Sequence, residues 1–187
     1  MGSNWPLLSL LVWLPILGGL ATLAFGRERA EAARWFALVV SAATLLLCVP
    51  LYTGFDAGSA AMQFVERLPW IPSFRIFYHL GVDGISIALI VLTTITTLLV
   101  IVGAWRSVED KVHQYMATIL MLEGIMIGVF AAMDAMLFYV FFEAMLIPMF
   151  VIIGVWGGPR RVYASIKFFL YTFLGSIFML IGLIYLY

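Results

Sequence analysis

The sequence predicts an all-α integral membrane protein of about six transmembrane helices, with its amino terminus outside. Three observations carry this prediction. The chain is 65% hydrophobic and only 11% charged, with a mean hydropathy of +1.12, whereas soluble domains are about a quarter charged. Several nearly uncharged runs are long enough to cross the roughly 30 Å of hydrocarbon in a bilayer. The basic residues gather in alternate connections between these runs.

Each predicted span is a run of about 17 to 25 mostly apolar residues, the length that a helix needs to cross a bilayer. Two of the six contain a single acidic residue, Glu123 in the fourth and Glu143 in the fifth. Asp134, between these two spans, is expected to be an exposed helix-capping residue. In chain order the predicted spans are Asn4–Gly26, Trp35–Tyr52, Gly84–Trp105, Gln114–Met133, Ala135–Gly157 and Phe168–Tyr187.

The distribution of Lys and Arg predicts the orientation. Eight of these residues lie in the first, third and fifth connections, and the other two, Arg67 and Arg75, lie in the long second connection, Thr53–Asp83. Because basic loops stay inside, we expect the amino terminus and the long connection to lie outside. Pro69 and Pro72 argue against a regular helix through the middle of that outer loop.

Composition also excludes several classes of function. Ten basic and ten acidic residues cancel, so the chain offers no nucleic-acid surface. Cys48 is the only cysteine, which rules out an internal disulfide and indicates a small core residue. No cluster of Cys and His is present to hold haem or an iron–sulfur cluster. We therefore expect no cofactor and no metal in this chain.

Glu143 is the main candidate for chemistry, because an ionisable side chain at bilayer depth is costly and usually faces protein or water. It lies ~20 Å from the inner end of its predicted span. Pro148 cannot donate a hydrogen bond to the carbonyl of Ala144, so that carbonyl is available to a water molecule. A carboxyl beside a wetted kink suits a proton relay. The alternative is a protonated Glu143 whose hydrogen bond serves packing.

Glu123 and Lys167 are the two auxiliary candidates. Glu123 is flanked by Gly124 and Gly128, and small residues let helices approach closely. Glu123 is therefore either an auxiliary proton carrier or a local packing residue. Lys167 lies only ~10 Å deep at the start of the sixth span, so it either takes part in the relay or extends its ammonium to the inner surface. Its depth differs from that of Glu143 by roughly 10 Å, which disfavours a direct pair.

Three segments of the chain resemble one family. YHLGVDGIS (Tyr78–Ser86) resembles the outer-loop motif of the antiporter-like M subunit of respiratory complex I, the proton-translocating NADH:quinone oxidoreductase, known in mitochondria as chain 4. Gly128–Phe150 and Gly154–Thr172 resemble the region of its helices five and six. The resemblance covers essentially the whole chain.

The resemblance implies one part of a larger antiporter-like bundle, which couples electron transfer elsewhere in the complex to proton translocation through a buried Glu/Lys relay. By motif, Glu143 matches the family's helix-five glutamate and Lys167 matches the lysine that opens helix six. Glu123 matches a carboxylate that many members have.

The resemblance also implies that the chain is an enzyme only as a subunit. NADH, FMN, iron–sulfur clusters and quinone are then expected in other subunits. The expected partners are the neighbouring membrane-arm subunits and the lipid bilayer. The expected location is the bacterial inner membrane or the mitochondrial inner membrane.

The resemblance divides the chain into two expected regions. Residues 1–133 form an amino-terminal region with the first four helices and the outer loop 53–83. Residues 134–187 form the start of a proton-translocating core, which we expect to be incomplete because family members are much longer. Two alternatives stay open: a subunit of a cation/proton antiporter or membrane-bound hydrogenase, which the YHLGVDGIS motif disfavours, and a structural scaffold without a proton path.

Overall fold

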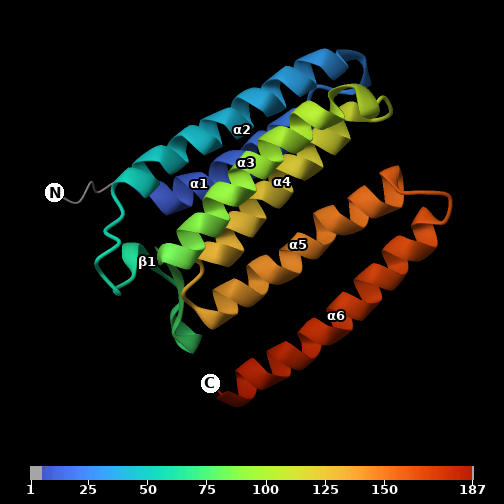
Figure 1. The fold of residues 1–187 in the computed structure, drawn as a ribbon. Coiled ribbons are helices and arrows are strands. Elements are labelled where there is room, and N and C mark those ends of the chain that lie inside the picture. The colour runs from blue at the N-terminus through green and yellow to red at the C-terminus, as the bar shows by residue number, and fades with distance from the viewer. Residues whose placement is uncertain (1–5, 187) are drawn as a thin grey trace.

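Six α-helices and one β-hairpin make up the described part of the chain, residues 6–186, in the computed structural model (Figure 1). Successive helices run in opposite directions, so the three basic connections meet at one end of the bundle, which we call the basic end. The β-hairpin lies at the other end, the hairpin end. The helices are α1 (Leu7–Leu23), α2 (Ala30–Thr53), α3 (Gly84–Ser107), α4 (Val112–Ala131), α5 (Ala135–Trp156) and α6 (Arg161–Leu186), and the strands are β1 (Gln63–Ile71) and β2 (Ile76–Val82).

The predicted membrane class is confirmed. The helices α2 to α6 are long and apolar enough to cross a bilayer, and α1, with 17 residues, is at the short end of the range for a span. The predicted start of the first span, at Asn4, and the predicted end of the last, at Tyr187, lie outside the described residues. The orientation of the amino terminus stays a prediction.

Two helices begin earlier than their uncharged runs. The helix α2 begins at Ala30, not Trp35, after a 3₁₀ turn at Arg27–Arg29, and α6 begins at Arg161, not Phe168. A charged residue is compatible with a helix where that helix leaves the hydrocarbon, so an uncharged run marks membrane depth and underestimates helix length. As a result Lys167 lies inside α6.

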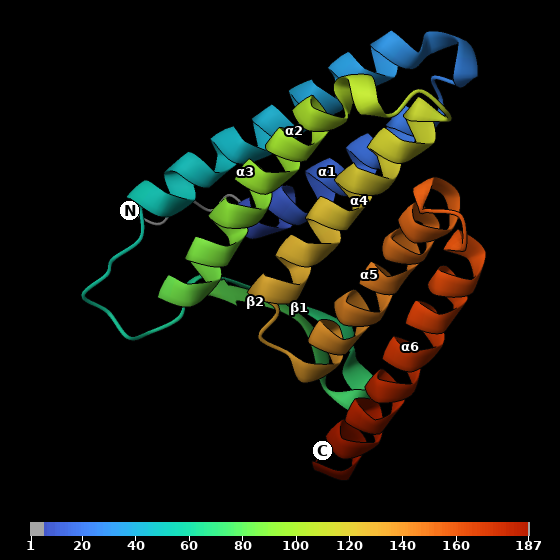
Figure 2. The same ribbon diagram turned by 45° about the vertical axis from the view of Figure 1, so that its right-hand side comes forward.

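The helix α4 is the centre of the bundle. It packs against α1, α2, α3 and α5, whereas α6 packs mainly against α5, at the edge of the described bundle (Figure 2). Glycines allow the close approach of α1 and α4. A Cβ at Gly124 would overlap the backbone oxygen of Val12, and one at Gly19 would lie 2.7 Å from the backbone oxygen of Ala117.

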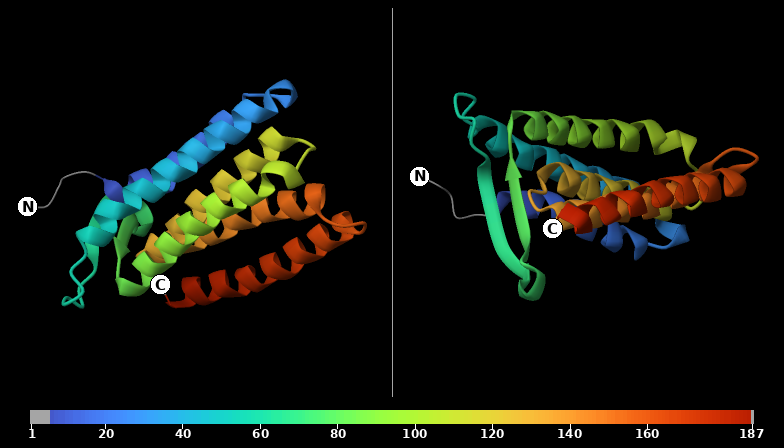
Figure 3. Two further views of the ribbon diagram at one scale, coloured as in Figure 1. Left: turned by 45° about the horizontal axis from the view of Figure 1, so that its top comes forward. Right: turned by 90° about the horizontal axis from the view of Figure 1, so that it is seen from below.

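The long connection contains a two-stranded antiparallel sheet, which the sequence analysis did not predict. Figure 3 shows β1 and β2 crossing the hairpin end of the bundle. Pro69 is compatible with β1 because both strands of a two-stranded sheet have a free edge. The turn lacks the Asn-Gly or Asp-Gly pair that marks a tight hairpin. It consists instead of a 3₁₀ turn at Pro72–Phe74 and a left-handed Arg75, at φ 53°.

Carboxylates attach the hairpin to the helices. Glu66 of β1 accepts hydrogen bonds from the backbone nitrogens of Leu8 (2.7 Å) and Ser9 (3.1 Å) at the start of α1. A negative side chain at that position also interacts favourably with the helix dipole. The hairpin is thereby bonded directly to the first span.

Asp83 and Asp134 cap two further helices at the same end. Asp83 accepts a hydrogen bond from the backbone nitrogen of Ser86 at the start of α3, at 2.7 Å, and this bond lowers the pKa of its carboxyl. Asp134 caps α5 through the backbone nitrogens of Met136 and Leu137, which confirms its predicted capping role. The prediction that it is exposed was wrong, because it is half-buried and also accepts from the backbone nitrogen of Phe77 in β2, at 3.1 Å.

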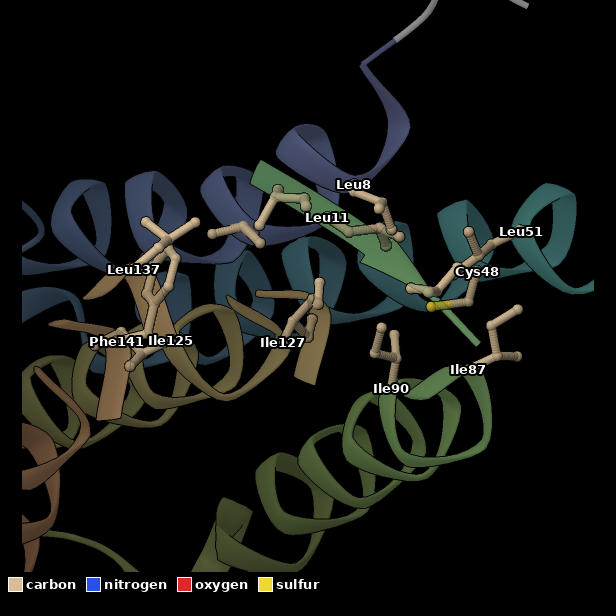
Figure 4. Packing of buried hydrophobic residues seen from close by; sticks show 14 residues of the cluster. Leu8, Leu11, Cys48, Leu51, Ile87, Ile90, Ile125, Ile127, Leu137 and Phe141 are labelled. Carbon is tan, nitrogen blue, oxygen red and sulfur yellow. The ribbon is translucent and has the colours of Figure 1, made fainter. Parts of the chain in front are cut away.

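The apolar core of the hairpin end draws side chains from five helices. Leu8 and Leu11 of α1 lie near Cys48 and Leu51 of α2 in Figure 4. Cys48 is 2% exposed, which confirms that it is a small core residue. The other labelled members of the cluster come from α3, α4 and α5: Ile87, Ile90, Ile125, Ile127, Leu137 and Phe141.

The first prediction concerns topology. Reporter fusions at Arg29, Arg106 and Arg160 should report the cytoplasmic side, and a fusion at Ser59 should report the external side, because basic connections stay inside. The measurement is the ratio of a phosphatase signal to a fluorescent signal in membranes. An external signal from any of the three basic connections would contradict the orientation.

The second prediction concerns the contact between α1 and α4. Gly124→Ala should lower stability, because its Cβ meets backbone that cannot rotate away, and overpacking costs about 1–3 kcal/mol. Gly103→Ala in α3 is the matched control, since nothing lies within 4 Å of its Cβ position. Thermal denaturation of the full protein in detergent measures the difference. Equal denaturation temperatures for the two variants would show that the close approach is not limiting.

Candidate functional site

Glu143 lies near the middle of α5. At ~1.5 Å per residue it is roughly 20 Å from Trp156 at the basic end of the helix. Its residue is half-buried, and its Oε1 atom is buried without a hydrogen-bond partner among the described residues. Buried polar atoms almost always have a partner, often an ordered water molecule. This carboxyl therefore has an open bonding capacity at bilayer depth.

Tyr139 is a polar neighbour of Glu143 on α5. The Tyr139 side chain interacts with both the Glu143 carboxyl and the Ser176 hydroxyl. Ser176 comes from α6, is 3% exposed and donates to the carbonyl of Phe173 at 2.8 Å. A hydroxyl both donates and accepts, so the three side chains form a short polar path between α5 and α6.

Sequence reasoning missed these two hydroxyl groups. Tyr139 and Glu143 are four residues apart on one helix, which places them on one face, so this signal was present in the sequence. Ser176 gave no such signal, because its approach to Glu143 depends on how α6 is registered against α5.

Pro148 lies inside α5, as predicted. It has no N–H to donate to the carbonyl of Ala144, so this carbonyl, next to Glu143 in sequence, lacks its usual helical partner. The backbone of α5 thus adds a second acceptor near the carboxyl.

Lys167 does not lie next to Glu143 in the structure. The register of the α5–α6 hairpin is fixed by Gly154, whose Cβ position is 3.3 Å from Ser165 Oγ, and by the rings of Phe150 and Phe169, 5.7 Å apart. Counted from these contacts, the level of Lys167 is roughly nine residues, or ~13 Å, from that of Glu143.

The Lys167 side chain is exposed on α6, between two aromatic rings. Its Nζ is 5.8 Å from the ring centroids of both Tyr163 and Tyr171, a distance at which a cation is attracted to a ring face. Tyr163, Lys167 and Tyr171 thus form an exposed stripe on α6 that faces away from α5.

Glu123 is the most deeply buried acidic side chain described, at 1% exposed. Both of its carboxyl oxygens are buried without a partner among residues 6–186. The ring of Phe141 occupies the space beside Gly128, and counting from this contact puts Glu123 level with Leu146. The two carboxyl groups therefore differ in depth by only ~5 Å.

Comparisons place these residues in a known family. The family model for the transmembrane part of NADH:quinone oxidoreductase and Mrp antiporters matches residues 132–187. The chain is 48% identical over 185 residues to NADH-quinone oxidoreductase subunit M of Rhodobacter capsulatus, covering 97% of this chain and 36% of that protein. It is 42% identical to NADH-ubiquinone oxidoreductase chain 4 of Arabidopsis thaliana, covering 95% and 36%. The chain thus spans a little over a third of the length of these relatives.

Solved structures show the same fold. The chain is similar to a chain of respiratory complex I from Thermus thermophilus, with a TM-score of 0.79 at 29% identity, covering 95% of this chain and 35% of that one. It also resembles a chain of the Mrp complex from Dietzia, with a TM-score of 0.76 at 16% identity, covering 91% and 18%. At that identity the second likeness shows the fold alone.

The third prediction tests the contact between Tyr139 and the pair of Glu143 and Ser176. Tyr139→Phe should lower the free energy of unfolding by about 0.6–1 kcal/mol, the usual contribution of one side-chain hydrogen bond inside a membrane. Tyr185→Phe is the control, because Tyr185 is 88% exposed. Denaturant titration of the full protein in micelles measures both. Indistinguishable midpoints would show that the Tyr139 hydroxyl does not join the two helices.

Proposed function

Because the chain belongs to the antiporter-like subunit M family of NADH:quinone oxidoreductase, we propose that it carries part of a proton path through the membrane arm of that complex. Its relatives in bacteria and mitochondria and its apolar helices make it a multi-pass inner-membrane protein. The observation that carries the proposal is the Glu143 carboxyl, held near mid-membrane depth with one buried oxygen that has no partner in the described part of the chain.

Glu143 is the central proton carrier in this proposal. A carboxylic acid donates a proton and the carboxylate accepts one, so the group moves protons between hydrogen-bonded neighbours on its two sides. Tyr139 provides one neighbour and relays to Ser176. A water molecule bonded to the Ala144 carbonyl provides a neighbour on the other side.

Coupling to electron transfer acts through charge. In a low-dielectric site a nearby unit charge changes the energy of an ionised carboxylate by far more than it does in water. A charge displaced elsewhere in the complex therefore biases Glu143 toward release or uptake of its proton. The protein chain itself performs no redox step in this scheme.

Lys167 and Glu123 have auxiliary roles in the proposal. Lys167 acts through an intervening water chain, because the ~13 Å separation along the helix hairpin is too long for direct transfer. Glu123 lies close in depth to Glu143 but one helix further from α6, so it serves as a second acid on the far side of α5.

The redox groups belong to other subunits under this proposal. NADH, FMN, iron–sulfur clusters and quinone need ligands or pockets of their own, and within residues 6–186 no group of three or more His, Cys, Asp or Glu is arranged to hold a metal ion. The partners are neighbouring membrane-arm subunits, in keeping with the multi-subunit complexes of its relatives. Cation/proton antiport is not favoured, because the relatives that match nearly the whole chain, at 48% and 42% identity, are subunits of NADH-quinone and NADH-ubiquinone oxidoreductases.

The fourth prediction tests Glu143 in the full-length subunit. Glu143→Gln keeps the shape and hydrogen-bonding capacity but cannot release a proton, so proton uptake coupled to NADH:quinone turnover should fall by roughly 100-fold or more, as expected for loss of a central acid–base group. Glu143→Asp should retain part of the activity. Proton uptake and turnover are measured in membrane vesicles, with complex content checked on a native gel.

Two further variants test how much the auxiliary residues contribute to proton uptake. Glu123→Gln should cause a milder loss than Glu143→Gln, and Lys167→Ala should fall between them. Normal pumping by a fully assembled Glu143→Gln complex would contradict the relay and would favour the structural scaffold.

A further inference from the structure

Glu123 is a buried acidic residue whose carboxyl lacks a hydrogen-bond partner among the described residues. Its side chain is 1% exposed, yet neither carboxyl oxygen has a hydrogen-bond partner within residues 6–186. Burying a polar group without a partner costs several kcal/mol in an apolar medium. Such groups in folded proteins are normally bonded to protein or to ordered water. A partner of some kind is therefore needed at this carboxyl.

Glu123 is one of the residues that line a groove between α3 and α4, and most of the other lining residues are apolar. The groove has a volume of about 270 Å³, and a water molecule takes up about 30 Å³ in the liquid. Three threonines of α3 line it together with Glu123: Thr93, Thr96 and Thr97. Their spacing of three and four residues puts them on one helix face. The groove thus has room for several water molecules beside three threonines and a glutamate whose carboxyl has no partner among the described residues.

The threonines keep bonding capacity for a ligand in the groove. Thr93 Oγ1 donates to the carbonyl of Leu89 at 2.8 Å, and this leaves its oxygen lone pairs free to accept. A hydroxyl that has donated to its own helix remains an acceptor. Water donates to threonine oxygens and both donates to and accepts from a carboxyl, whereas a lipid tail does neither.

A second unpartnered hydroxyl lies at the same depth. Ser41 of α2 is 0% exposed, and its Oγ atom also has no hydrogen-bond partner among the described residues. Counted from the basic ends of their helices, Ser41, Thr97 and Glu123 all lie roughly 15–17 Å deep. Three helices therefore contribute polar side chains to one layer near the middle of the bundle.

We propose that the groove between α3 and α4 is an internal water site, in which Glu123 and the threonine face of α3 bind a small cluster of water molecules. The site stands on this geometry alone. Its use as a proton reservoir for Glu123 rests on the proposed function, because water is the neighbour that would let this carboxyl exchange a proton.

Thiol reactivity in the full-length complex tests the water site. Thr97→Cys and Leu99→Cys are each made in a Cys48→Ala background, and membrane vesicles that contain them are treated with silver ions. A thiol that has bound silver is protected from later alkylation, and peptide mass spectrometry measures the alkylated fraction at each position. The thiol of Thr97→Cys should react with silver at least roughly tenfold faster than the thiol of Leu99→Cys. The thiolate is the reactive form, and a thiol in apolar surroundings is inert. Leu99 is the control on the same helix, 62% exposed on its apolar side.

Glu123 variants in the Thr97→Cys background identify what holds the water. Glu123→Leu should lower the reaction rate to that of Leu99→Cys, whereas Glu123→Gln should preserve it, since an amide still bonds water. Equal rates for Thr97→Cys and Leu99→Cys would overturn the proposal in favour of a groove filled by lipid. A rate unchanged by Glu123→Leu would also overturn it.

Hydration and proton movement are read separately in this design. Native gels confirm that each variant assembles. Proton uptake by Glu123→Gln reports only on the relay, because this variant keeps the bound water. A negative result for proton uptake would therefore contradict only the proposed function, and a negative result for thiol reactivity would contradict only the water site.

Discussion

The structure depends on one constraint: polar groups that are shielded from water must find hydrogen-bond partners. At the hairpin end this constraint is met by carboxylates. Glu66, Asp83 and Asp134 each accept backbone N–H groups at a helix start, where a helix leaves N–H groups without intrahelical partners. Two of these carboxylates, Glu66 and Asp134, also join the hairpin to the bundle. These carboxylates thus cap the helices, and two of them also hold the sheet across the ends of the helices.

In the middle of the bundle the constraint is left partly unmet, and this is where the candidate chemistry lies. Glu123 and Glu143 both have carboxyl oxygens without a partner among the described residues, at depths that differ by only ~5 Å. Their surroundings differ. Glu143 has hydroxyl neighbours across the contact of α5 and α6, whereas Glu123 borders a groove of its own. A carboxyl kept available in this way suits proton transfer better than packing.

Packing gives α4 and α6 opposite characters. The helix α4 is enclosed on most sides, with Gly124 against α1 and Gly128 against α5, so Glu123 is held rigidly. The helix α6 packs mainly against α5 within the described bundle, so the stripe of Tyr163, Lys167 and Tyr171 is on an exposed face. Glu143 lies between these two regions, at the contact of the fixed part of the bundle with its exposed helix.

The sequence by itself determined the membrane class, the order of the spans and the depths of Glu123 and Glu143. Charged side chains are costly in hydrocarbon, so the spans can be recognised as runs of the sequence with almost no charge. It also predicted that Asp134 caps a helix. Only the tertiary structure decided that Ser176 approaches Tyr139 and Glu143, that Lys167 faces away from them, and that Glu123 borders a threonine-lined groove. These features depend on how each helix is rotated and registered against its neighbours. The β-hairpin escaped prediction because its turn uses a left-handed Arg75 where glycine or asparagine is the usual signal.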